Sequence, residues 1–171
     1  MGEKLTKDDV KKIQAEIDHR KLEIRPKALE DVKTARAQGD LSENFEYYAA
    51  KKFNRENNSR IEYLEKMLKN AEIIEVVVDD SVNINNTIKV AFVEDGVDEE
   101  NWDVDSYKLV TSIRTDSLKN KVSIESPIGK ALLSRNVGEI VTVNLEDGRS
   151  YELKILEIIK EDLGEDEIMQ F

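Results

Sequence analysis

Apolar residues recur at helical spacing through the first part of the chain. Before residue 39 they lie three, four or seven positions apart, at Val10, Ile13, Ile17, Ile24, Ala28, Val32 and Ala35. A second series ends on Ile61, Leu64, Leu68 and Ala71. This spacing places apolar side chains along one face of an α-helix. We predict two long helices, from about Asp8 to Gln38 and from about Glu43 to Ile74, that fold back on each other as an antiparallel hairpin.

The pattern changes to that of β-strands after Ile74. β-branched runs at 75–78, 87–93, 105–113, 137–145 and 149–159 are separated by Asp, Asn and Gly. Asp147-Gly148 is typical of a hairpin turn, and Ser126-Pro127 is typical of a helix start that continues to about Ser134. We therefore predict an antiparallel sheet crossed by one short helix, which makes the fold class α+β.

Two local features interrupt the helical pattern. Pro26 lies inside the first helix, where its ring removes a backbone hydrogen bond, so we expect a bend or a restart at Arg25-Pro26. Between Ala50 and Ile61 the second helix has Phe53 as its only large apolar residue. We expect weaker packing over that stretch.

The connection between the two helices carries the most informative chemistry. Gly39-Asp40-Leu41-Ser42-Glu43-Asn44 places two carboxylates three residues apart at the bend. Either Asp40 or Ser42 caps the second helix, with Glu43 serving in its first turn. Alternatively, Asp40 and Glu43 face outward and hold Mg²⁺. Two ligands at the end of a rod do not make a tight metal site, so the ion would be shared with another macromolecule.

Charge divides the chain unevenly. Residues 1–75 carry 16 basic and 16 acidic side chains, whereas the remainder carries 10 and 21, so the whole net charge of −11 lies in the second part. An acidic domain of this kind suits a protein partner with basic patches better than free nucleic acid. Near the bend, Arg36, Lys51, Lys52 and Arg55 form either a solvated helix face or a basic patch that holds a phosphate backbone.

Composition excludes several classes of function. The chain has no cysteine, and its only histidine, His19, lies on a predicted helix surface, so thiolate sites, histidine metal sites and a Ser-His-Asp triad are excluded. The sequence shows no membrane-spanning apolar run and no signal-peptide core, so the simplest compartment is the cytoplasm. We expect residues 94–105 to form a loop anchored by Trp102, and residues 161–171 to form a mostly disordered acidic tail.

Two segments resemble the bacterial Gre transcript cleavage factors of the GreA/GreB type. Residues 35–44, followed by Glu46-Tyr47 and 49–51, resemble the coiled-coil tip of that family. Residues 122–133, followed by 137–139 and a hairpin near Gly148, resemble its C-terminal FKBP-like domain. The match at the bend is the more specific one. With the helical layout between them, the two matches span most of residues 8 to 158.

The resemblance implies a domain plan and a set of partners. It implies a coiled-coil hairpin over residues 1–75, an FKBP-like domain over 76–160 and a tail over 161–171. The partners would be bacterial RNA polymerase, whose secondary channel the hairpin enters, and the 3′ end of nascent RNA; we expect a monomer that does not bind membranes. Asp40 and Glu43 would be lent to the polymerase active site to help hold a shared Mg²⁺, with no cofactor bound tightly by the chain alone.

The implied function is transcription elongation by stimulated cleavage of backtracked RNA. The protein would be no enzyme itself, because the polymerase does the cutting. Arg36, Lys51, Lys52 and Arg55 would hold the RNA. Two alternatives remain open. One is a channel-binding regulator that inhibits the polymerase, and the other is an FKBP-like adaptor or prolyl isomerase, although the aromatic residues that an isomerase pocket needs are scattered in the sequence.

Overall fold

The computed structural model describes residues 2–39, 44–160 and 168–169. They divide into two compact units. The first, Met1–Glu3 with Asp8–Glu72, is a helical rod, and the second, Lys4–Lys7 with Ile73–Phe171, is built on a sheet. Within the described ranges, no helix is long and apolar enough to cross a membrane.

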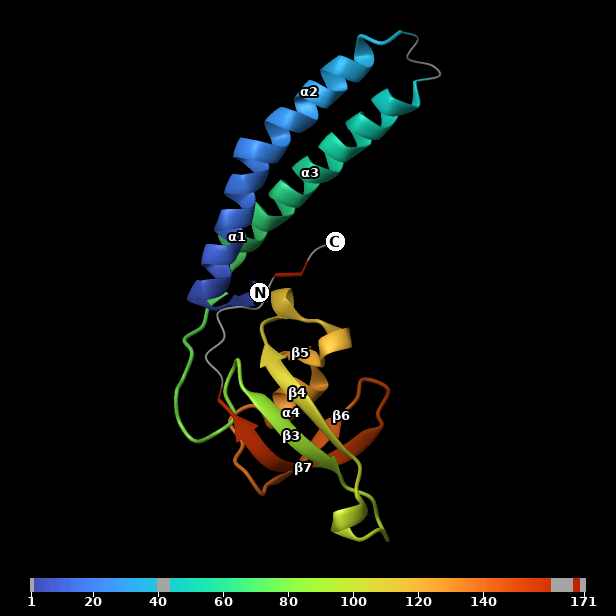
Figure 1. Cartoon of the computed structure of the whole chain (residues 1–171). Helices are drawn as coiled ribbons and strands as arrows, with labels where there is room; N and C mark the ends of the chain where they lie inside the picture. The colour runs from blue at the N-terminus through green and yellow to red at the C-terminus, as the bar shows by residue number, and fades with distance from the viewer. Residues whose placement is uncertain (1, 40–43, 161–167, 170–171) are drawn as a thin grey trace. The chain divides into compact units, whose positions relative to one another are not determined.

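The rod is an antiparallel pair of long helical segments, as predicted (Figure 1). Its first arm comprises α1 (Lys7–His19), a π-helical turn (Arg20–Ile24) and α2 (Arg25–Arg36), and its second arm is α3 (Phe45–Asn70). The seam consists of Ile13, Ile17, Ala28 and Ala35 on one arm, and Tyr47, Ile61, Leu64 and Met67 on the other, all buried. The predicted apolar spacing therefore locates the interface between the arms.

The backbone stays helical through Pro26, but the helix type changes where a bend or a restart was predicted: the π-helical turn ends at Ile24, and α2 begins at Arg25 with Pro26 in its first turn. His19, Ile24 and Arg25 all keep right-handed helical backbone angles, and the Arg25 N–H donates to the carbonyl of Arg20, five residues back. Proline has no N–H, and its ring collides with the carbonyl four residues earlier in a regular α-helix. The π-helical turn widens the helix just before Pro26 and so accommodates the ring without a break.

Polar bonds between the arms replace apolar packing beside this turn. Arg20 Nη1 donates to Asn57 Oδ1 at 3.0 Å, and Arg25 Nε donates to Asn58 Oδ1 at 3.0 Å. Asparagines of the stretch where weak packing was expected thus bind the opposite arm. One helical turn before Arg20, the Glu16 carboxylate accepts hydrogen bonds from Arg20 at 2.8 Å and from Arg60 at 2.9 Å. Arg60 is 4% exposed, so this ion pair is largely withdrawn from water.

The second unit contains a five-stranded sheet in the order β5-β4-β3-β7-β6. Its strands are β3 (Thr87–Phe92), β4 (Val104–Val110), β5 (Lys121–Ser123), β6 (Ile140–Asn144) and β7 (Ser150–Ile159). Two further short strands, β1 (Lys4–Leu5) and β2 (Glu72–Ile73), pair separately. The β4–β5 pair is parallel, so the sheet is mixed rather than wholly antiparallel. The 75–78 run predicted as a strand is not one, and Val78 is 88% exposed.

The sheet curls around an apolar core that α4 (Pro127–Leu132) helps to cover (Figure 1). Ser126 caps α4 as predicted, because its hydroxyl accepts from the Gly129 N–H at 3.1 Å. A Cβ at Gly129 would lie 2.0 Å from the Ser123 carbonyl oxygen, so only glycine lets α4 approach β5 this closely. The predicted hairpin turn is also confirmed, with Gly148 at φ +85° between β6 and β7.

Candidate functional site at the end of the rod

The end of the rod is organised by Asn44. Its side-chain oxygen accepts from the Tyr47 N–H at 3.0 Å and so caps α3. Its amide nitrogen donates to the Ala35 carbonyl oxygen at 2.7 Å, at the end of α2. Gly39, at φ +126°, adopts a backbone conformation that only glycine enters easily. One side chain therefore closes both arms across the connection.

The expectation that Asp40 or Ser42 caps the second helix is wrong. The helix begins at Phe45, two residues later than predicted, and Asn44 is its N-cap. The physical reason lies in the chemistry of the amide group. A carboxylate only accepts hydrogen bonds, whereas an asparagine accepts with its oxygen and donates with its nitrogen. The Asn44 amide therefore caps α3 and binds a carbonyl of α2 at the same time, which the Asp40 carboxylate could not do.

Asp40 and Glu43 belong to residues 40–43, which lie outside the described residues. Their assignment as ligands therefore stays a prediction. The chain connects them directly to Gly39 and Asn44, whose surroundings are described above. Within the residues that the structure describes, no group of three or more histidine, cysteine, aspartate or glutamate side chains could hold a metal ion.

Two of the four predicted basic residues meet at Tyr47. The Arg36 guanidinium lies 5.8 Å and the Lys51 ammonium 5.9 Å from the centre of the Tyr47 ring. A hydrogen bond from Arg36, followed by the charge of Lys51, lowers the pKa of the Tyr47 hydroxyl. The Tyr47 side chain is buried, and its ring contacts one cation from each arm beside the connection. The two exposed cations thus lie on either side of the connection, each in contact with Tyr47.

The other two basic residues are not brought into this group. Lys52 pairs with Glu56 at 3.7 Å on the exposed surface of α3. Arg55 is exposed, two helical turns from Tyr47 along the same helix. The structure thus separates a Tyr47-centred pair, Arg36 and Lys51, from two cations that extend the basic surface toward the middle of the rod.

Aromatic residues at the rod end were not predicted as functional. Tyr47 and Tyr48 contact each other edge to face at 5.5 Å between ring centres. Phe45, in the first turn of α3, is 85% exposed. A single exposed ring is common on protein surfaces, so Phe45 alone does not mark a contact surface. The sequence signal was present, because three aromatic residues fall within four positions after Asn44.

The remaining candidates show no catalytic arrangement. His19 is exposed on the first arm, as predicted, with Nδ1 3.1 Å from Glu23 Oε2. Trp102 is half-buried and donates to the Val97 carbonyl at 3.1 Å, which closes the acidic loop on itself. Phe92 and Tyr151 stack at 5.9 Å, so these two aromatic residues of the sheet unit are not scattered as the sequence suggested.

Comparison with known proteins assigns both parts of the chain to one family. Residues 3–73 match the N-terminal model of the transcription elongation factor GreA/GreB, and residues 77–160 match its C-terminal model. Transcription elongation factor GreA of Lachnoclostridium phytofermentans is 40% identical over 91% of this chain and 94% of its own. The GreA of Thermoanaerobacter pseudethanolicus is 44% identical over 91% of this chain and 96% of its own.

Among solved structures, the chain is similar to GreA factor homolog 1 (Gfh1) of Thermus thermophilus. That likeness covers 94% of this chain and all of the other, with a TM-score of 0.43 and 22% identity, and has no bearing on activity. The two family models and the full-length relatives carry the assignment. The chain belongs to the GreA/GreB family of transcription elongation factors.

Proposed function

We propose that this protein rescues arrested transcription by stimulating RNA polymerase to cleave backtracked nascent RNA. Members of its family are accessory factors of RNA polymerase, and the protein is one of them rather than an enzyme. The rod enters the secondary channel of the bacterial polymerase as a monomer and brings its end to the RNA 3′ terminus. Because the bacterial polymerase works in the cytoplasm, the protein acts there.

The observation that supports this proposal best is the capping of α3 by Asn44. Because the amide of Asn44 caps the helix, the α3 N-terminus does not require the Asp40 carboxylate or the Ser42 hydroxyl as a cap. Asp40 and Glu43 then serve as ligands supplied to the polymerase. Two carboxylates suit Mg²⁺, which takes few protein ligands and completes its shell with water and phosphate oxygens. An ion shared there would stabilise the charge that develops on the oxygens of a phosphodiester.

The basic residues orient the RNA beside these acids. Arg36 and Lys51 are held against Tyr47 from opposite arms and remain exposed at the rod end. Cations in fixed positions position a phosphate backbone without reading its sequence. Lys52 and Arg55 lie farther along α3 and contact the more distant part of the backtracked RNA.

Neutralising the Tyr47-centred pair tests this role. We expect the double variant Arg36→Gln/Lys51→Gln to lower cleavage of long backtracked RNA by about tenfold, because two phosphate contacts are lost. Short backtracked fragments reach fewer of these cations and should be affected less. On a log–log plot of cleavage against salt concentration, the slope should become shallower by about 1.4, which is about 0.7 for each lost phosphate contact.

The matched control is Lys27→Gln/Lys33→Gln, which removes the same charge from exposed positions of α2. It should leave cleavage nearly unchanged at either length. If both double variants lowered cleavage equally, or if cleavage of long and short RNA fell equally, Arg36 and Lys51 would be ordinary solvated residues without a role in RNA binding.

The two parts of the chain divide the work in this proposal. The sheet domain, from about residue 76 to 160, docks on the polymerase near the channel and supplies affinity, while the rod of residues 1–75 carries the activity. The acidic surface of the sheet domain should speed its association with a basic surface of the polymerase. Because salt screens this attraction, binding should weaken as the salt concentration rises.

A chain ending near Glu75 should therefore stimulate cleavage only at higher concentration than the whole protein. The isolated sheet domain should compete for the polymerase without stimulating cleavage. Titration of each fragment in a cleavage assay measures both effects. Stimulation by the sheet domain alone, or full affinity of the rod alone, would overturn this division.

A further inference from the structure

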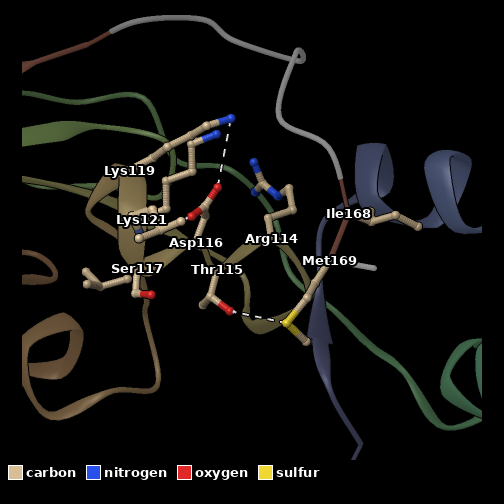
Figure 2. A pocket seen from close by; sticks show the side chains of 10 residues that line it. Arg114, Thr115, Asp116, Ser117, Lys119, Lys121, Ile168 and Met169 are labelled. Carbon is tan, nitrogen blue, oxygen red and sulfur yellow. Dashed lines mark hydrogen bonds and ion pairs between the residues drawn. The ribbon is translucent and has the colours of Figure 1, made fainter. Parts of the chain in front are cut away.

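Basic side chains gather around an open pocket of about 720 Å³ in the sheet unit, which Figure 2 shows. Arg114, Lys119 and Lys121 line this pocket, and Lys119 Nζ lies 3.9 Å from the Asp116 carboxylate. Ile168, which also lines it, is directed away from these cations (Figure 2). None of the contacts that the structure describes around the pocket indicates a class of ligand. The rod has a second group of exposed cations, and aromatic rings accompany that group.

A stripe of exposed side chains, here called the α3 stripe, runs along the first part of α3. Its members are Phe45, Tyr48, Lys52 and Arg55, spaced three, four and three residues apart. Because an α-helix has 3.6 residues per turn, this spacing places all four side chains on one face. Phe45 is 85% exposed and Tyr48 is 52% exposed, and both cations are also exposed. The α3 stripe therefore presents two rings followed by two positive charges.

The α3 stripe faces water rather than the other arm of the rod. Tyr47, which lies between the two rings in sequence, is buried in the seam. The Tyr48 ring contacts the Tyr47 ring edge to face, with 5.5 Å between their centres, so the seam supports one ring of the stripe. Lys52 Nζ lies 3.7 Å from Glu56 Oε1. An exposed ion pair of this kind is weak, so Lys52 can exchange the carboxylate for a phosphate.

This combination of side chains is typical of surfaces that bind single-stranded nucleic acid. Cations attract the phosphate backbone, and aromatic rings stack on the faces of unpaired bases. Two rings bury at most about 500 Å² between them, whereas a stable protein–protein interface buries roughly 1,200 Å² or more. The α3 stripe therefore suits unpaired RNA better than it suits a protein surface.

We propose that Phe45 and Tyr48 stack on unpaired bases of the backtracked RNA, while Lys52 and Arg55 hold its phosphates. This stacking depends on the function proposed above, because that function brings the extruded RNA to the rod end. The rings lie at the start of α3, beside the connection, and the cations lie about 10 and 15 Å from Phe45 along the helix axis. The RNA is thus held by its bases next to the connection and by its backbone along α3.

Abasic nucleotides in the extruded RNA test the stacking, because they keep the phosphates and remove the bases. The double variant Phe45→Ala/Tyr48→Ala should stimulate cleavage of RNA with normal bases at least about tenfold less than the unaltered chain does. On abasic RNA the two chains should differ little, because the variant and the abasic RNA each lack the same contact. An equal loss on both RNAs would overturn the proposal.

Phe53→Ala is the matched control, because Phe53 is as exposed as Tyr48, at 52%, but lies outside the α3 stripe. It should leave stimulated cleavage of both RNAs unchanged, and a loss equal to that of the double variant would contradict the proposal. The double variant should also bind the polymerase as tightly as the unaltered chain does. If its affinity fell in parallel with cleavage, the rings would contact the polymerase and not the RNA.

An aminopurine base in the extruded RNA gives a readout that does not depend on cleavage, since its fluorescence falls when it stacks on a ring. Adding the unaltered chain to the backtracked complex should lower the fluorescence, and adding the double variant should lower it much less. No change, or an equal change with both chains, would overturn the stacking. A fall with the unaltered chain alone, without stimulated cleavage, would support the stacking and refute the proposed function.

Discussion

Replacing either acid of the connection should nearly abolish stimulated cleavage. We expect Asp40→Ala or Glu43→Ala to slow RNA cleavage by about 10²- to 10³-fold, because a group that stabilises the transition state is lost. Binding to the polymerase should change little, since neither side chain contributes much docking surface. The rate of cleavage in a backtracked elongation complex, compared with the affinity for the polymerase, measures the two effects separately.

Asp31→Ala is the matched control, because it removes one exposed carboxylate from α2 without touching the connection. This variant should stimulate cleavage by the polymerase as well as the unaltered chain does. Helix content should also be unchanged in the Asp40 and Glu43 variants, because Asn44 caps α3. Asn44→Ala, by contrast, should lower stability by about 0.5–2 kcal/mol. A loss of helix content or of binding in parallel with cleavage would make the acids structural.

Replacing Glu16 should destabilise the rod more than any exposed substitution. Glu16→Gln removes the carboxylate that pairs with the nearly buried Arg60, and removal of one partner of a buried pair costs about 3–5 kcal/mol. Glu65→Gln is the matched control, because the Lys21–Glu65 pair also joins the two arms but is exposed. Its loss should cost less than about 1 kcal/mol. Thermal unfolding followed by helical circular dichroism measures both, and equal effects would contradict this account.

The same ion pair should make the rod sensitive to acid. Burial raises the pKa of Glu16, but hydrogen bonds and charges from Arg60 and Arg20 outweigh burial and lower the pKa below its ordinary value. A depressed pKa stabilises the fold above the unfolded-state value, about pH 4.3, and this stability is lost as pH falls below it. Glu16→Gln should therefore flatten the loss of rod stability below about pH 4.3. If rod stability fell with pH in the same way in Glu16→Gln and in the unaltered chain, another group would be responsible for the acid sensitivity.

Features encoded locally were predictable from the sequence. The periodic placement of Ile13, Ile17, Ile61 and Leu64 located the buried seam of the rod, because a helix repeats its faces within a few residues. Ser126 and Gly148 were recognised for the same reason, since a cap and a turn depend on only four or five neighbouring residues. The signature at the connection pointed to the family that the comparisons then identified.

Features that depend on distant partners were not predictable in this way. Asn44 caps α3 because it also binds Ala35 across the connection, and nothing in the capping pattern itself signals that second bond. The π-helical turn before Pro26 lies in an arm whose arginines on either side of the turn bond to Asn57 and Asn58 of the other arm.

The central claim is that this chain makes the polymerase cut RNA. The most direct measurement adds the full chain to a backtracked elongation complex of bacterial RNA polymerase with Mg²⁺ and follows release of labelled 3′ fragments over time. The proposal predicts faster fragment release, followed by renewed elongation from the new 3′ end. Fragment release that is unchanged or slowed, with the chain bound to the polymerase, would contradict the proposal and identify an inhibitory regulator of the same channel.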